Sequence, residues 1–397
     1  MKPSPSELRI PYFGQCHHSP PIHFLEDKLC RRLQMAALFV FIVDALTSAA
    51  PYLASLLLFA YVVVPVFLMY SGTFLHQHLF FMNWLQMPFR KFDDLRSCGV
   101  KCLGRNFAIE WDNKDQRRQR LGVWHILPKA LSDRYGEGGD TELTDVQFEQ
   151  LLALAEHPVV VYCHGNSFCR GTGHRVELYN VIAEQGYHVL TFDYRGYGDS
   201  SSRQPTEYSM AADATRVIRY AGRLTKAPVI VWGHSLGSAI AVKTMSDLFA
   251  NAPPAADGKA VGAWGLVLES PFNNLHDAVV NYPATILFRW FPDALFTRLF
   301  VTPYRQAGLC MASDERIANV NCPVLMLHAE DDRVLPVILG RRLREKAAAS
   351  GVNVEWVEFE TARRYKHTFI CRAPELPDIF QRFTGRCFDD PLLRETA

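Results

Sequence analysis

The stretch Val229–Val242, VIVWGHSLGSAIAV, decides which fold this sequence predicts. Four apolar residues lead into the motif GHSLG, and a run of small residues at helical spacing follows it. A serine between two glycines is typical of a sharp strand–turn–helix, which lifts the hydroxyl above a sheet and crowds the flanking positions. The residues of this predicted nucleophile elbow are Gly233, His234, Ser235, Leu236 and Gly237. The motif is short, so the rest of the chain must agree with it.

Apolar runs that are typical of buried parallel strands recur after residue 104. We expect strands at 107–111, 122–127, 158–163, 187–194, 228–233, 264–270, 323–328 and 352–359. We expect helices near 173–185, 208–224, 235–250, 337–350 and 375–384, and a loop at Gly136–Asp140. This alternation predicts an α/β fold, a mostly parallel sheet with helices on both faces.

An insert at 272–318 interrupts the alternation, and its residues 282–300 read YPATILFRWFPDALFTRLF. We expect it to form a helical cap over the site. Its apolar side chains would then line a channel for an acyl chain or touch a bilayer. Ordinary packing against the core is the alternative.

A serine hydroxyl becomes a useful nucleophile only when a base removes its proton. On a strand–turn–helix elbow the acid and then the histidine follow the serine in chain order. Beyond the acidic loop HAEDDRVLP at 328–336 the chain contains a single histidine, His367. We therefore predict Ser235 as the nucleophile and His367 as its base.

The acid that orients His367 comes from the same loop. We choose Asp332, because its spacing to Pro336 matches the usual acid loop of such enzymes. Asp331 is the first alternative and Glu330 the second.

Acyl transfer also needs N–H donors for the oxyanion that develops in the transition state. We expect one donor to be the N–H of Leu236, which follows the nucleophile. The loop after the strand at 158–163 contains His164, Gly165 and Asn166, and we assign the second donor to the Asn166 N–H. We expect His164 to hold this loop and not to act as a competing base.

A second glycine-containing loop, TFDYRGYGDSS at 191–201, follows the next strand. We expect an ion pair between Asp193 and Arg195 to shape it.

The overall composition excludes several classes of function. The formal net charge is +1, so a nucleic-acid partner is not expected. The ten cysteines show no matched pairs at zinc-ligand spacing, so we expect no metal. Chemistry on a serine, a histidine and a carboxylate needs no cofactor.

Residues 52–70, YLASLLLFAYVVVPVFLMY, carry no charge and are long enough to cross the roughly 30 Å hydrocarbon core of a bilayer. Pro65 would be costly in a buried globular helix but is tolerated in a membrane. The preceding apolar residues carry Asp44, whose charge costs about 2.5–3.5 kcal/mol at mid-membrane. We expect one span at 52–70 and leave open a second span at 35–50.

These motifs resemble the membrane-anchored α/β-hydrolase-domain lipases of the "domain-containing twelve" type, which cleave monoacylglycerol and lysophosphatidylserine. The resemblance runs from about Phe74 to Phe388, and HRVELY (174–179) and HAEDD (328–332) are its most specific parts. The other stretches that carry it are GVWHILP, HGNSFCRGTG, GYHVLTFDYRGYGDS, WGHSLG, LESPFNN and YKH. Members of that family can carry a glycosylation sequon after the anchor, and this sequence has none.

The resemblance implies an α/β-hydrolase fold with Ser235, Asp332 and His367 as its catalytic triad. It also implies an endoplasmic reticulum membrane protein with a luminal active site. The basic residues Lys28, Arg31 and Arg32 favour the same orientation, because they precede the apolar region, whereas Arg90, Lys91 and Arg96 follow it and count against that orientation.

We therefore divide the chain into five parts. They are a cytosolic segment (1–34), an apolar membrane region (35–72), a juxtamembrane connection (73–103), a hydrolase domain with its cap (104–388) and a tail (389–397). The expected partners are the lipid bilayer and a lysophospholipid or monoacylglycerol substrate, with the oligomeric state unassigned. A protein depalmitoylase or acyl-thioesterase on the same triad is the alternative, and a non-catalytic membrane scaffold is a remoter one.

Overall fold

The computed structural model describes residues 22–85, 91–113, 115–136, 143–250 and 263–389. The chain divides into two units, Met1–Val64 and Pro65–Ala397, and each is described by itself.

The first unit consists mainly of one long helix. Helix α1 (Ile22–Leu58) continues through a π-helical turn, η1 (Phe59–Val63), towards α2 (Val64–Tyr70). The π-helical turn ends two residues before Pro65, which has no backbone N–H to donate to the carbonyl one turn earlier. The segment Leu33–Tyr70 is apolar and long enough to cross a membrane. The helix has no break between 35–50 and 52–70, so the structure contains no turn that would make these two segments a hairpin of two spans.

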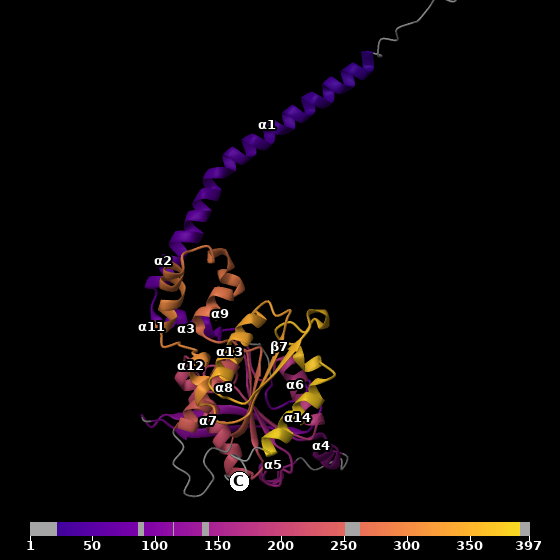
Figure 1. Ribbon diagram of the computed structural model, residues 1–397, viewed down its shortest axis with the longest axis vertical. Helices are drawn as coiled ribbons and strands as arrows, with labels where there is room; N and C mark the ends of the chain where they lie inside the picture. The colour runs from indigo at the N-terminus through magenta and orange to yellow at the C-terminus, as the bar shows by residue number, and fades with distance from the viewer. Residues whose placement is uncertain (1–21, 86–90, 114, 137–142, 251–262, 390–397) are drawn as a thin grey trace, which may run out of the picture. The chain divides into compact units, whose positions relative to one another are not determined.

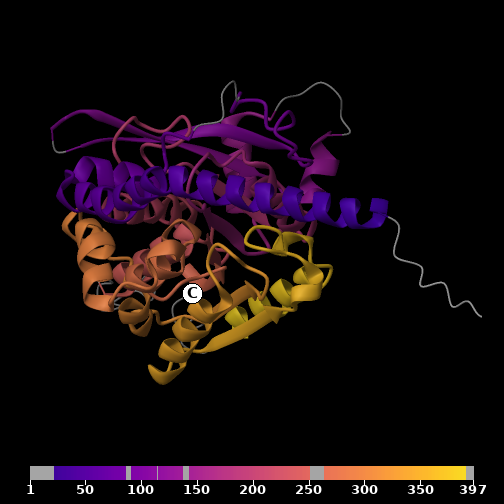
Figure 2. The ribbon, with the colours of Figure 1, turned by 90° about the horizontal axis from the view of Figure 1, so that it is seen from above.

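The second unit is built on an eight-stranded sheet of order β1-β2-β4-β3-β5-β6-β7-β8. The first two pairings, β1 with β2 and β2 with β4, are antiparallel, and the others are parallel. The early strands (purple) and the last strand (yellow) lie at opposite sides in Figure 2. The strands are β1 (Gly104–Asp112), β2 (Arg118–Ile126), β3 (Val159–Cys163), β4 (His188–Phe192), β5 (Val229–His234), β6 (Ala263–Glu269), β7 (Val324–Ala329) and β8 (Val354–Phe359).

All eight predicted strands are confirmed. Their apolar runs are continuous because alternate residues enter two cores, one on each face of the sheet. In β5, Val229 and Val231 belong to one core, and Ile230 and Trp232 belong to the other. The early part of β2, Arg118–Leu121, was missed, because burial alternates there and Leu121 is its only apolar residue.

Helices cover both faces of the sheet, as Figure 1 shows. One core contains residues of α7 (Glu207–Leu224), α8 (Leu236–Ala250) and α13 (Val337–Ala349). The other contains residues of α6 (Gly173–Glu184) and α14 (Leu376–Asp389). These five helices are confirmed. Three more were not predicted, namely α3 (Thr73–Phe81), α4 (Lys129–Gly136) and α5 (Asp145–Ala153). The predicted loop at Gly136–Asp140 lies outside the described residues after Gly136, which ends α4.

The insert between β6 and β7 is helical. It contains α9 (Leu275–Asn281), η2 (Pro283–Phe288), α10 (Asp293–Phe296), η3 (Thr297–Val301), α11 (Thr302–Gln306), α12 (Ser313–Arg316) and η4 (Ile317–Asn319). Its second half packs into the core through Phe296, Phe300 and Val301. Its first half exposes large apolar side chains, including Leu287 and Trp290. Core packing therefore explains only part of the insert.

Candidate active site

The elbow predicted from GHSLG is present between β5 and α8. Ser235 has a φ of 53°, a left-handed conformation that few residues other than glycine adopt. A Cβ at Gly233 would lie 2.4 Å from the Gly237 carbonyl oxygen, and a Cβ at Gly237 would lie 2.0 Å from the Cys163 carbonyl oxygen. Both glycines are therefore required by close backbone approach, and the turn holds Ser235 at the carboxyl end of β5.

The structure brings together the three residues predicted to react. Ser235 Oγ lies 2.9 Å from His367 Nε2, and His367 Nδ1 lies 2.7 Å from Asp332 Oδ2. An ionised carboxylate can only accept, so Nδ1 carries the imidazole proton and Nε2 is left to accept the serine proton. This arrangement can deprotonate Ser235.

The surroundings of Asp332 favour its ionised form. Burial alone would raise its pKa, but the neighbouring imidazoles of His367 and His328 outweigh burial and hold the pKa below its usual range. Its Oδ1 accepts the backbone N–H groups of Val334, at 2.8 Å, and Leu335, at 2.9 Å. The carboxylate is therefore fixed in place by its own loop.

The two alternative acids bind backbone and not the imidazole. Asp331 Oδ1 accepts the Lys366 N–H at 2.9 Å, and Glu330 Oε2 accepts the Thr361 N–H at 2.9 Å. Both carboxylates thereby tie the acid loop to the segment that carries His367.

His367 is also held from the elbow, which sequence reasoning missed. His234 Nε2 lies 2.9 Å from the His367 carbonyl oxygen, and Ser270 Oγ donates to the same oxygen at 3.3 Å. Burial, followed by the charge of His367, lowers the pKa of His234 well below its usual value, so the ring stays neutral and donates. No spacing rule indicates this contact, because the partners are far apart in the chain.

The predicted oxyanion loop lies against the elbow. A Cβ at Gly165 would lie 3.3 Å from the Ser235 Cβ. Among the described residues, the N–H groups of Asn166 and Leu236 have no hydrogen-bond partner. Because the Gly165 carbonyl and the Asn166 N–H share one trans peptide, they point in opposite directions. Whatever holds the Gly165 carbonyl therefore aims the Asn166 N–H.

Two buried side chains hold that carbonyl. His164 Nδ1 lies 2.7 Å from it, and Arg175 Nη2 donates to it at 3.0 Å. Burial, followed by the charge of Arg175, lowers the pKa of His164 well below its usual value, so this imidazole is neutral. Arg175 also donates to the carbonyls of Asn166, Ser167 and Cys169. Sequence reasoning did not single out Arg175, although it lies within the specific motif HRVELY.

The predicted ion pair between Asp193 and Arg195 is wrong. Asp193 is completely buried. Its carboxylate accepts a hydrogen bond from the Arg170 backbone N–H and forms an ion pair with the Arg170 guanidinium. Arg195 turns to α7 and pairs with Asp213, with Nε and Oδ1 2.8 Å apart. A fully buried carboxylate needs several donors, and Arg170 supplies them from one residue.

The predicted juxtamembrane connection also reaches the site. The carbonyl of Phe80 accepts from the Asn166 side-chain amide, and that of Phe81 accepts from the Tyr197 hydroxyl at 2.7 Å. The Phe168 N–H donates to the Leu85 carbonyl at 3.1 Å. Residues that follow the apolar helix thus form one wall of the oxyanion loop.

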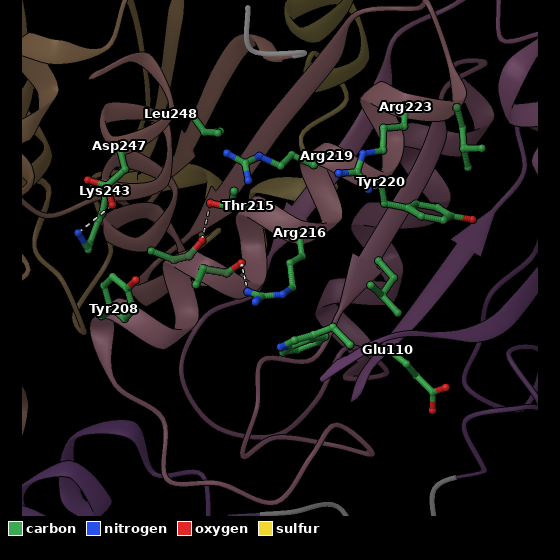
Figure 3. Close-up of a pocket in the computed structure, with 15 residues that line it drawn as sticks. Glu110, Tyr208, Thr215, Arg216, Arg219, Tyr220, Arg223, Lys243, Asp247 and Leu248 are labelled. Carbon is green, nitrogen blue, oxygen red and sulfur yellow. Dashed lines mark hydrogen bonds and ion pairs between the residues drawn. The ribbon is translucent and has the colours of Figure 1, made fainter. Parts of the chain in front are cut away.

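A separate cavity of about 900 Å³ lies between β1, α7 and α8 (Figure 3). Its lining is basic, with Arg216, Arg219, Arg223 and Lys243. Arg216 stacks on Trp111, with its guanidinium carbon 4.1 Å from the ring centroid. None of the predicted site residues lines this cavity. Within the described part of the chain, no three His, Cys, Asp or Glu side chains cluster in a way that could hold a metal ion.

Comparison with known proteins places the chain among hydrolases. A model of the alpha/beta hydrolase family matches residues 160–364. Lysophosphatidylserine lipase ABHD12 of Gallus gallus is 37% identical over 335 residues, which cover 83% of this chain and 82% of the relative. The Rattus norvegicus protein of the same name is 36% identical, over 82% of this chain and 78% of the relative. Protein ABHD12B of Homo sapiens is 33% identical, over 64% of this chain and 67% of the relative.

Proposed function

The chain belongs to the α/β-hydrolase family, in the group that contains the ABHD12 lysophosphatidylserine lipases, and from this premise we propose that it hydrolyses the acyl ester of single-chain lipids. Family membership makes it an ester-hydrolysing serine hydrolase. The proposed substrates are lysophosphatidylserine first, then other lysophospholipids and monoacylglycerol. All of them present one acyl ester next to a polar head.

The reaction proceeds through an acyl-enzyme. His367 Nε2 takes the proton of Ser235 as the hydroxyl oxygen attacks the ester carbonyl, and Asp332 stabilises the imidazolium that results. The tetrahedral intermediate collapses, and His367 returns the proton to the departing glycerol oxygen. Water then attacks the acyl-serine by the same route and releases the fatty acid. The observation that carries this proposal is the hydrogen-bonded chain of 2.9 and 2.7 Å through His367.

The N–H groups of Asn166 and Leu236 are the proposed oxyanion donors. Leu236 begins α8, so its N–H also carries the partial positive charge of a helix N-terminus. Each such donor contributes roughly 2.7–4 kcal/mol in the transition state of a serine hydrolase.

The proposed location is the endoplasmic reticulum membrane, with one span and a luminal catalytic unit. Support comes from the apolar helix Leu33–Tyr70 and from the basic residues that precede it. Protease added to sealed microsomes should leave residues 104–388 intact until detergent is added. Digestion without detergent would reverse the orientation.

Replacing the nucleophile tests the chemistry. Ser235→Ala should abolish both labelling by a fluorophosphonate probe and release of fatty acid from lysophosphatidylserine. Ser350→Ala, an exposed serine at the end of α13, is the matched control and should retain both. Persistent labelling of Ser235→Ala would refute the assignment. Loss of labelling in Ser235→Ala, together with a wild type that turns over only palmitoyl-cysteine peptides, would favour a thioesterase on the same triad.

A further inference from the structure

Exposed apolar side chains gather on the segment that leads from the apolar helix into the catalytic unit. On α2 and α3, Phe67, Tyr70 and Phe74 are 62%, 76% and 65% exposed. The opposite sides of the same helices pack inward, with Met69 and Phe80 against the core. These two short helices are therefore apolar on both sides, and the outer side is largely exposed.

The first half of the cap shows the same division. Ile286, Leu287 and Trp290 are exposed, the last of them by 69%, whereas Phe288 and Phe291 pack against the core. A water-facing surface does not ordinarily gather such large apolar side chains.

Helix α3 contacts the cap at α11, in the second half of the insert. Gln77 of α3 donates to the Ala307 carbonyl, next to α11, at 3.0 Å. The rings of His76 and Phe80 contact Tyr304 of α11, with centroids 5.5 and 5.6 Å apart. Figure 1 shows α2, α3, α9 and α11 at one end of the catalytic unit and α5 at the other. We call Phe74, Ile286, Leu287 and Trp290 the apolar end; Phe67 and Tyr70 belong to the candidate span itself.

The charge of this end suits a lipid surface. Residues 65–85 contain no Asp, Glu, Lys or Arg, and residues 282–292 contain only Arg289. The single charge within these two segments is of the sign that attracts anionic head groups, and the exposed carboxylate of Asp293 follows directly after the second segment.

The connection between the span and α3 indicates that the apolar end faces the lipid bilayer. The candidate span ends at Tyr70, and α3 begins at Thr73. The three intervening peptide links span at most about 11 Å. With the membrane crossing at the uncharged residues 52–70, the span leaves the bilayer near Tyr70. Helix α3 then begins beside the bilayer surface, and the apolar end begins with it.

We propose that the apolar end docks onto the bilayer surface, with Trp290, Leu287 and Ile286 inserted at the level of the lipid head groups. The catalytic unit is then held at the membrane by a second contact besides the span. Because the carbonyls of Phe80 and Leu85 bind the oxyanion loop, docking also keeps that loop next to the lipid from which a single-chain substrate departs. The proposal rests on the proposed anchoring but not on the reaction.

Fluorescence quenching tests insertion without any chemistry. The full chain carrying Ser235→Ala is reconstituted into phosphatidylcholine vesicles with or without dibrominated acyl chains. The emission of Trp290 is obtained as the difference between this chain and one that also carries Trp290→Phe. It should fall at least about twofold in brominated vesicles, because interfacial aromatic rings sit at the head-group and acyl boundary. An unquenched difference signal would overturn the proposal.

A control and a kinetic test complete the design. Leu154, which is 76% exposed beside α5, provides the control, and the emission added by Leu154→Trp should remain unquenched. Next, the rate on lysophosphatidylserine in vesicles is divided by the rate on soluble p-nitrophenyl acetate. Replacing Ile286, Leu287 and Trp290 together by serine should lower this ratio about tenfold, since partial burial of three large side chains is lost. Val146→Ser with Leu154→Ser should preserve it, and an unchanged ratio in the triple variant would contradict docking.

Discussion

Arg170 and Arg175 lie close together in the chain and are almost completely buried, yet they bind different kinds of acceptor. Arg170 binds the carboxylates of Asp193 and Asp199 and the amide oxygen of Asn106. Arg175 binds four backbone carbonyls of the oxyanion loop. Arg170 thus joins β1 to the loop after β4 through neutralised charges, whereas Arg175 orients peptide groups beside Ser235, the proposed nucleophile. The comparison teaches that a buried cation can be used for stability or for aiming a dipole.

The largest expected effect is on the free energy of unfolding, and it tests whether Arg170 serves stability. Arg170→Met leaves the fully buried Asp193 without its cation and should lower the free energy of unfolding by about 3–5 kcal/mol. The measurement is unfolding of the full chain in detergent micelles, by heat or urea. Adding Asp193→Asn should recover part of the loss. Wild-type stability in the single variant would show that the cluster is not structural.

Glu269 extends the comparison to a buried carboxyl group whose described hydrogen-bond partner is an indole and not a guanidinium. Trp232 Nε1 donates to its Oε2 at 2.9 Å, and burial raises the pKa of Glu269 to about 7 from an ordinary 4.5. Between about pH 4.5 and 7 the unfolded chain has released this proton while the folded chain keeps it. Stability should therefore fall by about 3 kcal/mol as pH rises through that window and level off above it.

Glu269→Gln should remove that slope and be more stable than the wild type above pH 7. Unfolding midpoints of both chains from pH 4 to 9 make the comparison. Parallel curves would mean that Glu269 is not the titrating group.

The next effect concerns catalysis. Arg175→Met frees the Gly165 carbonyl, so the Asn166 N–H loses its fixed direction, and kcat should fall about 100-fold with little change in KM. The kcat of Arg175→Lys should lie between those of the wild type and Arg175→Met, because an ammonium group cannot reach all four carbonyls. Steady-state kinetics on a soluble ester measure both. A change confined to KM would assign Arg175 to substrate binding instead.

The two arginines also show where sequence reasoning stops. The pairing of Ser235 with His367 could be predicted because the elbow is a local motif and only one histidine follows the acid loop. The strands could be predicted because a two-sided core makes their apolar runs continuous. The partners of Arg170 and Arg175 could not, since they depend on which loops meet after folding. Helix α3 was missed because residues 73–103 were assigned only as a connection after the anchor, and the packing of α3 beside Tyr304 depends on a segment far away in the chain.

The smallest expected effect concerns His234. Like Arg175, His234 is a buried donor that fixes a loop carbonyl, in this case that of His367. His234→Phe keeps a ring against His367, whose centroid lies 5.1 Å away, but removes the hydrogen bond to the His367 carbonyl. One neutral hydrogen bond contributes about 0.5–1.5 kcal/mol, so kcat should fall by up to about tenfold. His234→Gln retains an N–H donor and should lose less. Because His234 is neutral, the acid limb of the pH–rate profile should keep its midpoint in both variants, and a shifted midpoint would mean that His234 acts on His367 through charge and not through position.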